Sequence, residues 1–179
     1  MTSALLVIDV QRGLCEGTQV SFESRDVIAR INILSVRARA AGAPVVFVQH
    51  ETPTGLFAHG SETWQLALDL HTEAGDVFVR KTASDAFHHT DMSQILQGRG
   101  VTDLVICGMH SEYCVDSTTR RAAALGYPVV LAADAHTTED KAHLSGADIR
   151  RHENETLSNV TSYGVAIRAI DTEAVRFSG

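Results

Sequence analysis

Short apolar runs alternate with longer amphipathic segments along this chain, and this alternation restricts the fold more than any other feature. The runs predict strands at Ala4–Ile8, Pro44–Gln49, Asp76–Arg80, Leu104–Cys107, Pro128–Ala132 and Ala166–Asp171. Helices are expected between them, at Arg25–Ala41, Ser61–Leu70, Asp91–Gln97, Glu112–Leu125 and Glu139–Leu157. Strands that alternate with helices indicate a parallel sheet. We therefore predict a single α/β domain over residues 1–179, with a mostly parallel, six-stranded, doubly wound (Rossmann-like) sheet and helices on both faces.

Composition argues against several classes of partner. The 179 residues include 15 basic and 22 acidic side chains, which gives a formal net charge of −7. Because no basic patch is present, neither nucleic acid nor an anionic membrane is expected as a partner. The first residues, MTSALLVIDV, lack the basic start of a signal peptide, and no apolar run approaches the roughly 20 residues that cross a bilayer. We expect a soluble, cytoplasmic protein.

The chain has three cysteines, Cys15, Cys107 and Cys114. An odd number without short paired spacings argues against both a disulfide framework and a zinc site. Cys107 lies inside a predicted strand, where a cysteine behaves as a small buried hydrophobe. Cys15 falls in the loop after the first strand and is expected to be incidental. Cys114 remains as the cysteine with a chemical role.

Cys114 lies just after a predicted strand that turns at Gly108 and leads into a helix. Ser111 favours the N-cap position, which would make Glu112 the first helical residue and Cys114 the third. A thiol at that position faces the positive end of the helix dipole, so its thiolate should be favoured. Such strand-to-helix junctions are also where open parallel sheets bind their ligands. Cys114 is our candidate nucleophile.

Two more ionisable side chains directly follow strands. Asp9 ends the first strand and Lys81 ends the third. Seen alone, Asp9 would be a loop cap and Lys81 a solvated surface lysine. Because the carboxyl ends of parallel strands share one edge, however, both side chains should converge on Cys114. Lys81 would then lower the pKa of the thiol below its free value of about 8.5, and Asp9 could accept the thiol proton.

Three sequence blocks together point to a known family. They are LLVIDVQ with Asp9, RKTASDAF with Lys81, and GMHSEYCV with Cys114. In this order and spacing they resemble the isochorismatase-like cysteine hydrolase family, which is related to nicotinamidases, in its metal-independent branch. The resemblance implies a catalytic triad of Asp9, Lys81 and Cys114, a cis peptide bond at Met109–His110, and an oxyanion hole made by the N–H groups of His110 and Cys114. It also implies hydrolysis of a small amide C–N bond through a thioester, without a cofactor.

Several residues near the expected site are candidates for binding the substrate: Gln11, Trp64, Phe87, Tyr113 and His136. Trp64 and Phe87 could equally be core aromatics, and Gln11 could orient Asp9 or satisfy loop backbone. A small, partly apolar amide would suit such walls. No metal is expected, because nicotinamidases of this family bind theirs through an Asp-x-His pattern. Here Val48 stands two residues before His50.

Other functions compete with this interpretation. Vinyl ether hydrolysis of the isochorismatase type would use Asp9 as a general acid and needs no thiol. A nicotinamidase would require an atypical metal site at His50, His59 or His71. A signalling receiver module needs two adjacent acids after the first strand, whereas Val10 follows Asp9. The family resemblance also implies a homodimer or a larger homo-oligomer.

Overall fold

The computed structural model describes residues 2–17 and 20–179. Its sheet has six strands, all parallel, in the order β3-β2-β1-β4-β5-β6. The strands are β1 (Ser3–Ile8), β2 (Val45–His50), β3 (Val77–Lys81), β4 (Asp103–Met109), β5 (Val129–Thr137) and β6 (Ile167–Ile170). The six-stranded, doubly wound α/β fold predicted from the sequence is thus confirmed.

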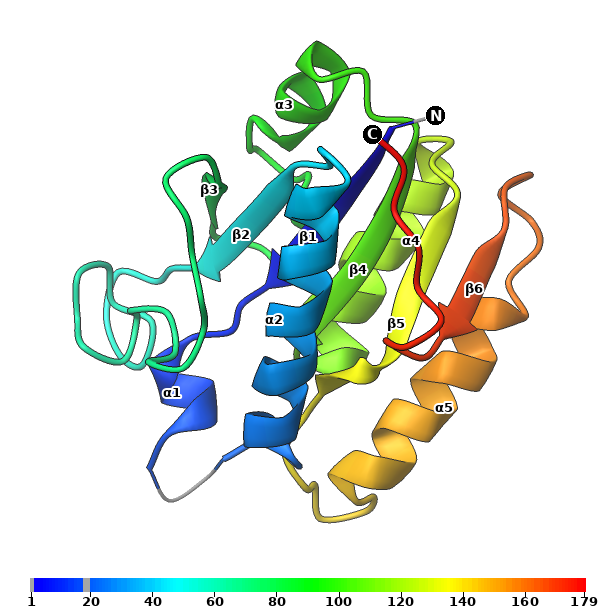
Figure 1. The fold of residues 1–179 in the computed structure, drawn as a ribbon. Coiled ribbons are helices and arrows are strands. Elements are labelled where there is room, and N and C mark those ends of the chain that lie inside the picture. Colours follow the sequence, from blue (N-terminus) through cyan, green and yellow to red (C-terminus); the bar gives the residue numbers. More distant parts are fainter. Residues whose placement is uncertain (1, 18–19) are drawn as a thin grey trace.

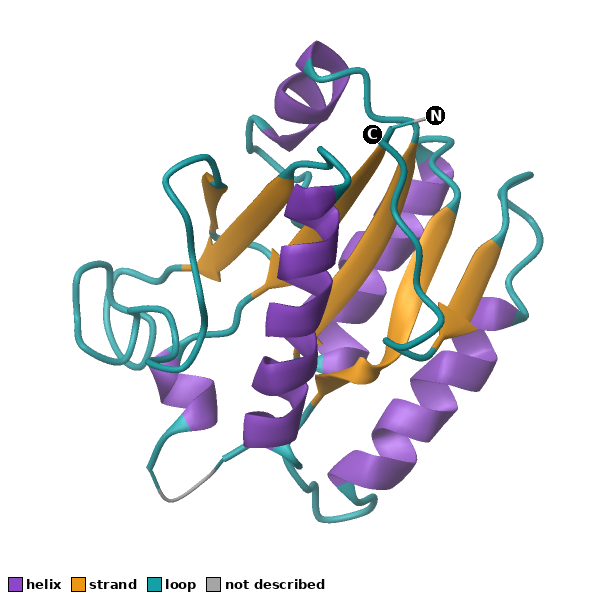
Figure 2. Ribbon diagram, viewed as in Figure 1, coloured by secondary structure: helices purple, strands orange, loops and turns teal. Residues whose placement is uncertain are grey.

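Helices cover both faces of this sheet (Figures 1 and 2). The helices are α1 (Arg12–Cys15), α2 (Ser24–Ala40), α3 (Met92–Gly98), α4 (Asp116–Ala124) and α5 (Gly146–Ser158). Helix α2 packs on one face through one apolar cluster, and α3, α4 and α5 contribute to a second cluster on the opposite face. Within the described residues, no helix is long and apolar enough to cross a membrane.

The strand order places the carboxyl ends of β1 and β4 side by side. Strand β1 pairs with β2 on one side and with β4 on the other, so the direction of winding reverses between β1 and β4. Such a switch point opens a crevice at the carboxyl ends of the strands. Gly108 permits the close approach of β4 to the end of β1, because it has a φ of 114° and a Cβ there would collide with the backbone of Ile8.

Several predicted elements differ from those observed. The segment 61–70 forms turns rather than a helix, because Gln11 pairs with Leu66 in an isolated bridge. The loop expected after the first strand contains the short helix α1. Helix α5 begins at Gly146 instead of Glu139, since Ser145 caps it by accepting the N–H of Asp148.

Strand β5 extends five residues beyond its predicted end at Ala132. The segment 134–137, which lies between the predicted strand and the predicted helix, therefore belongs to the sheet, and Gly108 and Met109 pair with His136 and Thr137 after a register shift. The hydroxyl of Thr137 donates to the carbonyl of Phe22, which satisfies a polar side chain inside the fold. This extension buries His136 completely.

Candidate active site

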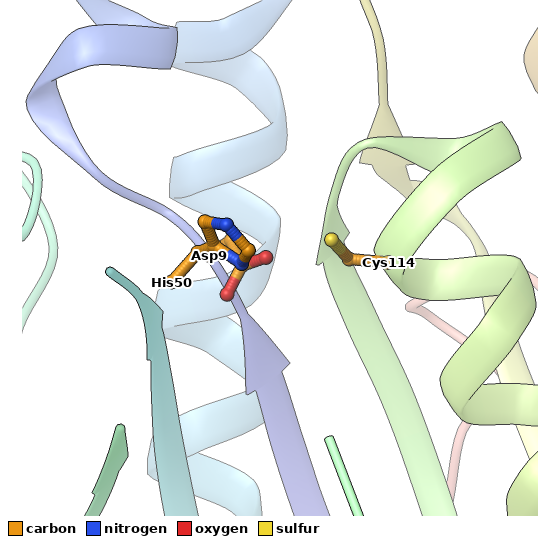
Figure 3. A group of neighbouring side chains, drawn as sticks. All are labelled: Asp9, His50 and Cys114. Carbon is orange, nitrogen blue, oxygen red and sulfur yellow. The ribbon is translucent and has the colours of Figure 1, made fainter. Parts of the chain in front are cut away.

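The three candidate catalytic residues lie together at the carboxyl edge of the sheet. The ammonium of Lys81 is 2.7 Å from Asp9 Oδ2 and 3.1 Å from Cys114 Sγ. Asp9 follows β1, Lys81 is the last residue of β3, and Cys114 lies in the turn after β4. Figure 3 shows Asp9 and His50 next to each other and the Cys114 sulfur pointing toward them from the turn after β4. The convergence predicted from the strand ends is therefore observed.

Asp9 is held by the backbone at both of its peptide groups. Its N–H donates to the carbonyl of Val48, and its carbonyl accepts the N–H of Gln11. Its φ is 50°, a left-handed conformation that Asp adopts more readily than most residues. The side chain is buried, and Oδ1 has no hydrogen-bond partner among the described residues. This oxygen is therefore the available proton acceptor of the site.

Lys81 is fully buried and surrounded by acceptors. Besides Asp9 and Cys114, its Nζ lies 3.0 Å from the carbonyl oxygen of Ala83 and 3.2 Å from Nδ1 of His50. A buried ammonium is costly unless it is paired and hydrogen-bonded, and here the carboxylate and three further acceptors compensate the lost hydration. The sequence reading of Lys81 as a surface residue is thereby excluded.

Asp9, His50 and Cys114 together have the residue types that could bind a metal ion. One ligand atom each from Asp9, His50 and Cys114 lies within 4.8 Å of the other two, which is close enough to share an ion. Lys81 Nζ, however, lies within 3.2 Å of all three residues and so takes the place that a cation would need. These residues do not fit a resident metal, because the protein's own ammonium already neutralises them.

The turn that carries Cys114 differs from the helix start predicted from the sequence. Residues Ser111–Val115 form a single π-helical turn, η1, and α4 follows at Asp116. The N-cap residue is His110, whereas the hydroxyl of Ser111 is bonded to Nδ1 of His136 at 2.8 Å. The predicted N-cap role of Ser111 is therefore wrong. The predicted cis peptide bond between Met109 and His110 is confirmed.

The resting state of Cys114 also differs from our expectation. Burial, and then the negative charge of Asp9, raise the pKa of its thiol to about 12, and the opposing effect of Lys81 is smaller. The predicted pKa below 8.5 is wrong for this reason. At neutral pH the free protein thus holds a protonated thiol beside an ion pair.

Gln11 has a different role from the predicted substrate contact. Its side chain is fully buried, and its Nε2 donates to the carbonyls of His50 and Trp64. Its Oε1 accepts the N–H of His50. Because both ends of the amide are engaged, Gln11 satisfies loop backbone instead of facing a substrate.

His136 and Phe87 are also inside the protein. The two ring nitrogens of His136 are bonded to Ser111 and, at 2.9 Å, to Oδ1 of Asn154. Burial lowers the pKa of His136 to about 4, so the ring is neutral at pH 7. Phe87 belongs to the apolar core and stacks on Tyr127. Both ring nitrogens of His136 are therefore engaged within the protein, which corrects its predicted contact with a substrate. Phe87 lies in the cluster against which Cys114 packs, and its contact with a substrate stays a prediction.

Tyr113 and Trp64 also remain candidates for binding a substrate. Tyr113 precedes the nucleophile, and about half of its surface (51%) is exposed. Trp64 packs edge-on against His59, and its Nε1 has no partner among the described residues. His50, which was considered from the sequence for an atypical metal site, also belongs to the site, because its Nδ1 lies 3.2 Å from Lys81 Nζ. Its position at the end of β2 was the signal that could have found this contact.

The chain matches a protein-family model, the isochorismatase domain, over residues 3–162. It belongs to the isochorismatase family. A solved structure of another isochorismatase family protein superposes with a TM-score of 0.86 at 34% identity, covering 94% of this chain and 98% of that one. The family predicted from the three sequence blocks is thus confirmed.

Curated relatives of this isochorismatase-family chain include proteins with named activities. A streptothricin hydrolase from Streptomyces noursei is 41% identical over 138 residues, which cover 76% of this chain and 50% of the relative. A ureidoacrylate amidohydrolase from Pseudomonas savastanoi pv. phaseolicola is 28% identical over an alignment of 214 positions that covers 98% of this chain and 84% of the relative. The chain therefore spans about half the length of the streptothricin hydrolase that it matches.

Proposed function

We propose that this protein hydrolyses a C–N bond of a small amide, with Cys114 as the nucleophile and a thioester as the intermediate. The observation that carries the proposal is the position of Lys81 Nζ, which bonds both the carboxylate of Asp9 and the sulfur of Cys114. The names of the relatives, a streptothricin hydrolase and a ureidoacrylate amidohydrolase, support the same class of reaction.

In the first step the thiol proton of Cys114 moves to Asp9. The free Oδ1 of Asp9 is the acceptor, and Lys81 stabilises the thiolate that forms. The sulfur then attacks the amide carbonyl and the carbonyl oxygen becomes an oxyanion. We assign the N–H groups of His110 and Cys114 to this oxyanion, a role in which the loss of one donor costs about 10²- to 10³-fold in rate.

In the second half, Asp9 returns its proton to the departing nitrogen as the C–N bond breaks. This leaves a thioester on Cys114 and a deprotonated Asp9. Asp9 then takes a proton from water as the water oxygen attacks the thioester. When that intermediate collapses, Asp9 gives the proton to the departing sulfur, which releases the carboxylic acid and restores the thiol. Every proton in this cycle passes through Asp9, and no cofactor is required.

The proposal extends to the walls of the site, the location of the protein and its oligomeric state. Tyr113 and Trp64 are proposed as walls for the substrate, because neither is committed to the core. We also propose a cytoplasmic location, which three free cysteines support. A homodimer or larger homo-oligomer is proposed because α2 exposes the apolar side chains of Ile33 and Val36.

A panel of small primary amides, N-carbamoyl compounds and lactams tests the reaction, with released ammonia or amine as the readout. Turnover should require Cys114, and a slow substrate should leave an acyl adduct on Cys114 that intact-mass spectrometry detects. Cys114→Ser should abolish turnover, whereas Cys15→Ser, which changes a cysteine outside the triad, should retain it. Hydrolysis of a vinyl ether by Cys114→Ser at the wild-type rate would instead favour the thiol-independent reaction.

A further inference from the structure

The ammonium of Lys81 has more acceptors than protons. A lysine carries three N–H donors, yet four acceptors lie within 3.2 Å of its Nζ. The two shortest contacts, to Asp9 at 2.7 Å and to the carbonyl of Ala83 at 3.0 Å, each claim one N–H. The third N–H is left to two competitors, Cys114 Sγ at 3.1 Å and His50 Nδ1 at 3.2 Å.

His50 is held in place for this contact by its own backbone. Gln11 accepts the N–H of His50 and donates to its carbonyl, so one buried amide clamps both sides of the residue. The imidazole also packs edge-on against Phe57, with ring centroids 5.4 Å apart. Both contacts limit the freedom of the ring, and they direct Nδ1 toward Lys81.

The protonation of His50 follows from its neighbours. Lys81 can only donate, so Nδ1 must accept, and the ring proton of the neutral imidazole lies on Nε2. Burial and the charge of Lys81 lower the pKa of His50, and Asp9, the backbone of Ala83 and Glu51 oppose this only in part. Because its pKa is lowered from 6.5, His50 is a neutral acceptor at pH 7, where Cys114 is a thiol.

We propose that His50 is a positioning residue that sets the reactivity of Cys114 by competing with its sulfur for the third N–H of Lys81. The proposal rests on the proposed function. While Cys114 is a thiol, a weak acceptor, His50 shares that N–H with the sulfur and keeps the ammonium oriented. When the thiol proton moves to Asp9, the thiolate becomes the stronger acceptor and the N–H turns from His50 to sulfur.

The test is the apparent pKa of Cys114, measured from its alkylation by iodoacetamide against pH with peptide-mass readout. In His50→Phe the ring packing is kept but the acceptor is lost, so the third N–H should serve sulfur alone. The apparent pKa of Cys114 should fall by about one, and alkylation below that pKa should rise about threefold, since a lower pKa also weakens the nucleophile.

Matched variants make the result specific. In His50→Asn the side-chain oxygen can occupy the position of Nδ1, so this variant should restore the wild-type pKa. His59→Phe removes a histidine of the loop that follows β2, where His59 packs against Trp64, and it should leave the apparent pKa of Cys114 unchanged. An unchanged or raised pKa in His50→Phe, or a failure of His50→Asn to restore it, would overturn the proposal.

Lys81→Met separates this proposal from the function on which it rests. Loss of the ammonium should raise the apparent pKa of Cys114 in any form of the proposed mechanism. If Lys81→Met raises it and His50→Phe leaves it unchanged, only the role of His50 fails. If neither variant changes the alkylation profile, the assignment of Lys81 and Cys114 to one catalytic group fails with it.

Discussion

Replacing Asp9 by Asn should activate the Cys114 thiol toward alkylation while it stops catalysis. A carboxylate oxygen of Asp9 lies within 4.8 Å of Cys114 Sγ. At an effective dielectric constant of about 20, two unit charges at that distance interact by about 3.5 kcal/mol, which corresponds to about 2.5 in pKa. Removing the negative charge should therefore lower the pKa of Cys114 from about 12 to between about 9 and 10.

The assay compares two rates on the same protein preparations. At pH 8 the thiolate fraction of Asp9→Asn should rise by about 300-fold, and the lower nucleophilicity of a less basic thiolate should reduce the net gain in alkylation to about 20-fold. Turnover of an amide substrate should be lost, because the amide of Asn neither accepts the thiol proton nor protonates the leaving nitrogen. Alkylation and turnover should thus change in opposite directions.

The control is Asp69→Asn, which makes the same change in net charge at an exposed residue. It should leave both rates at their wild-type values. If alkylation of Asp9→Asn were equal to that of the wild type, or slower, the carboxylate of Asp9 would not be the charge that keeps Cys114 protonated. The same result would remove the reason for assigning the thiol proton to Asp9.

Three further variants test the surroundings of the site. Burial and the neighbouring carboxylate of Asp116 raise the pKa of Glu153 to about 7, so the wild-type protein loses stability as pH rises from about 4.5 to 7. Glu153→Gln should therefore raise the free energy of unfolding by at most about 3 kcal/mol at pH 8 and by little at pH 4, as measured by denaturant unfolding. His136→Phe leaves the hydroxyl of Ser111 and the side-chain oxygen of Asn154 without their partner, and it should lower Tm by about 5 to 10 °C in a thermal melt. Gly108→Ala should yield no soluble protein on expression, because its Cβ would meet the backbone of Ile8.

The parts of the fold that the sequence predicted are those that follow from local hydrophobic pattern. Strand β1 begins one residue before its predicted start, and β6 lies within its predicted range. Asp9 and Lys81 were found because a polar residue that ends an apolar run of a parallel sheet must lie at the carboxyl edge. Pattern and topology together were enough to bring the three catalytic candidates to one place.

The errors concern residues whose environment is set by distant partners. The polar segment after Ala132 is typical of a loop, yet His136 is buried because Asn154 of α5 and Ser111 of η1 satisfy its ring nitrogens. Gln11 is likewise buried because the backbones of His50 and Trp64 satisfy its amide. No spacing in the sequence reveals such a partner, since the contacts join residues 18 to 53 positions apart.

The pKa of Cys114 was predicted in the wrong direction for a related reason. The sequence shows a helix start and a lysine, both of which favour a thiolate, but it does not show how deeply the thiol is buried. It also gives no distance from Asp9 to the sulfur. Burial and that carboxylate together outweigh Lys81 in the folded protein.

A protonated thiol is nevertheless compatible with catalysis, because the charge of the buried group is the same before and after proton transfer. With the thiol and the Asp9 carboxylate, the group formed with Lys81 has a net charge of zero. With the thiolate and a protonated Asp9 the sum is again zero. A pKa of about 12 measures the loss of the proton to solvent, which would leave a net negative charge in a buried site. Transfer to Oδ1 of Asp9 avoids that cost, so the nucleophile can form inside the site at neutral pH.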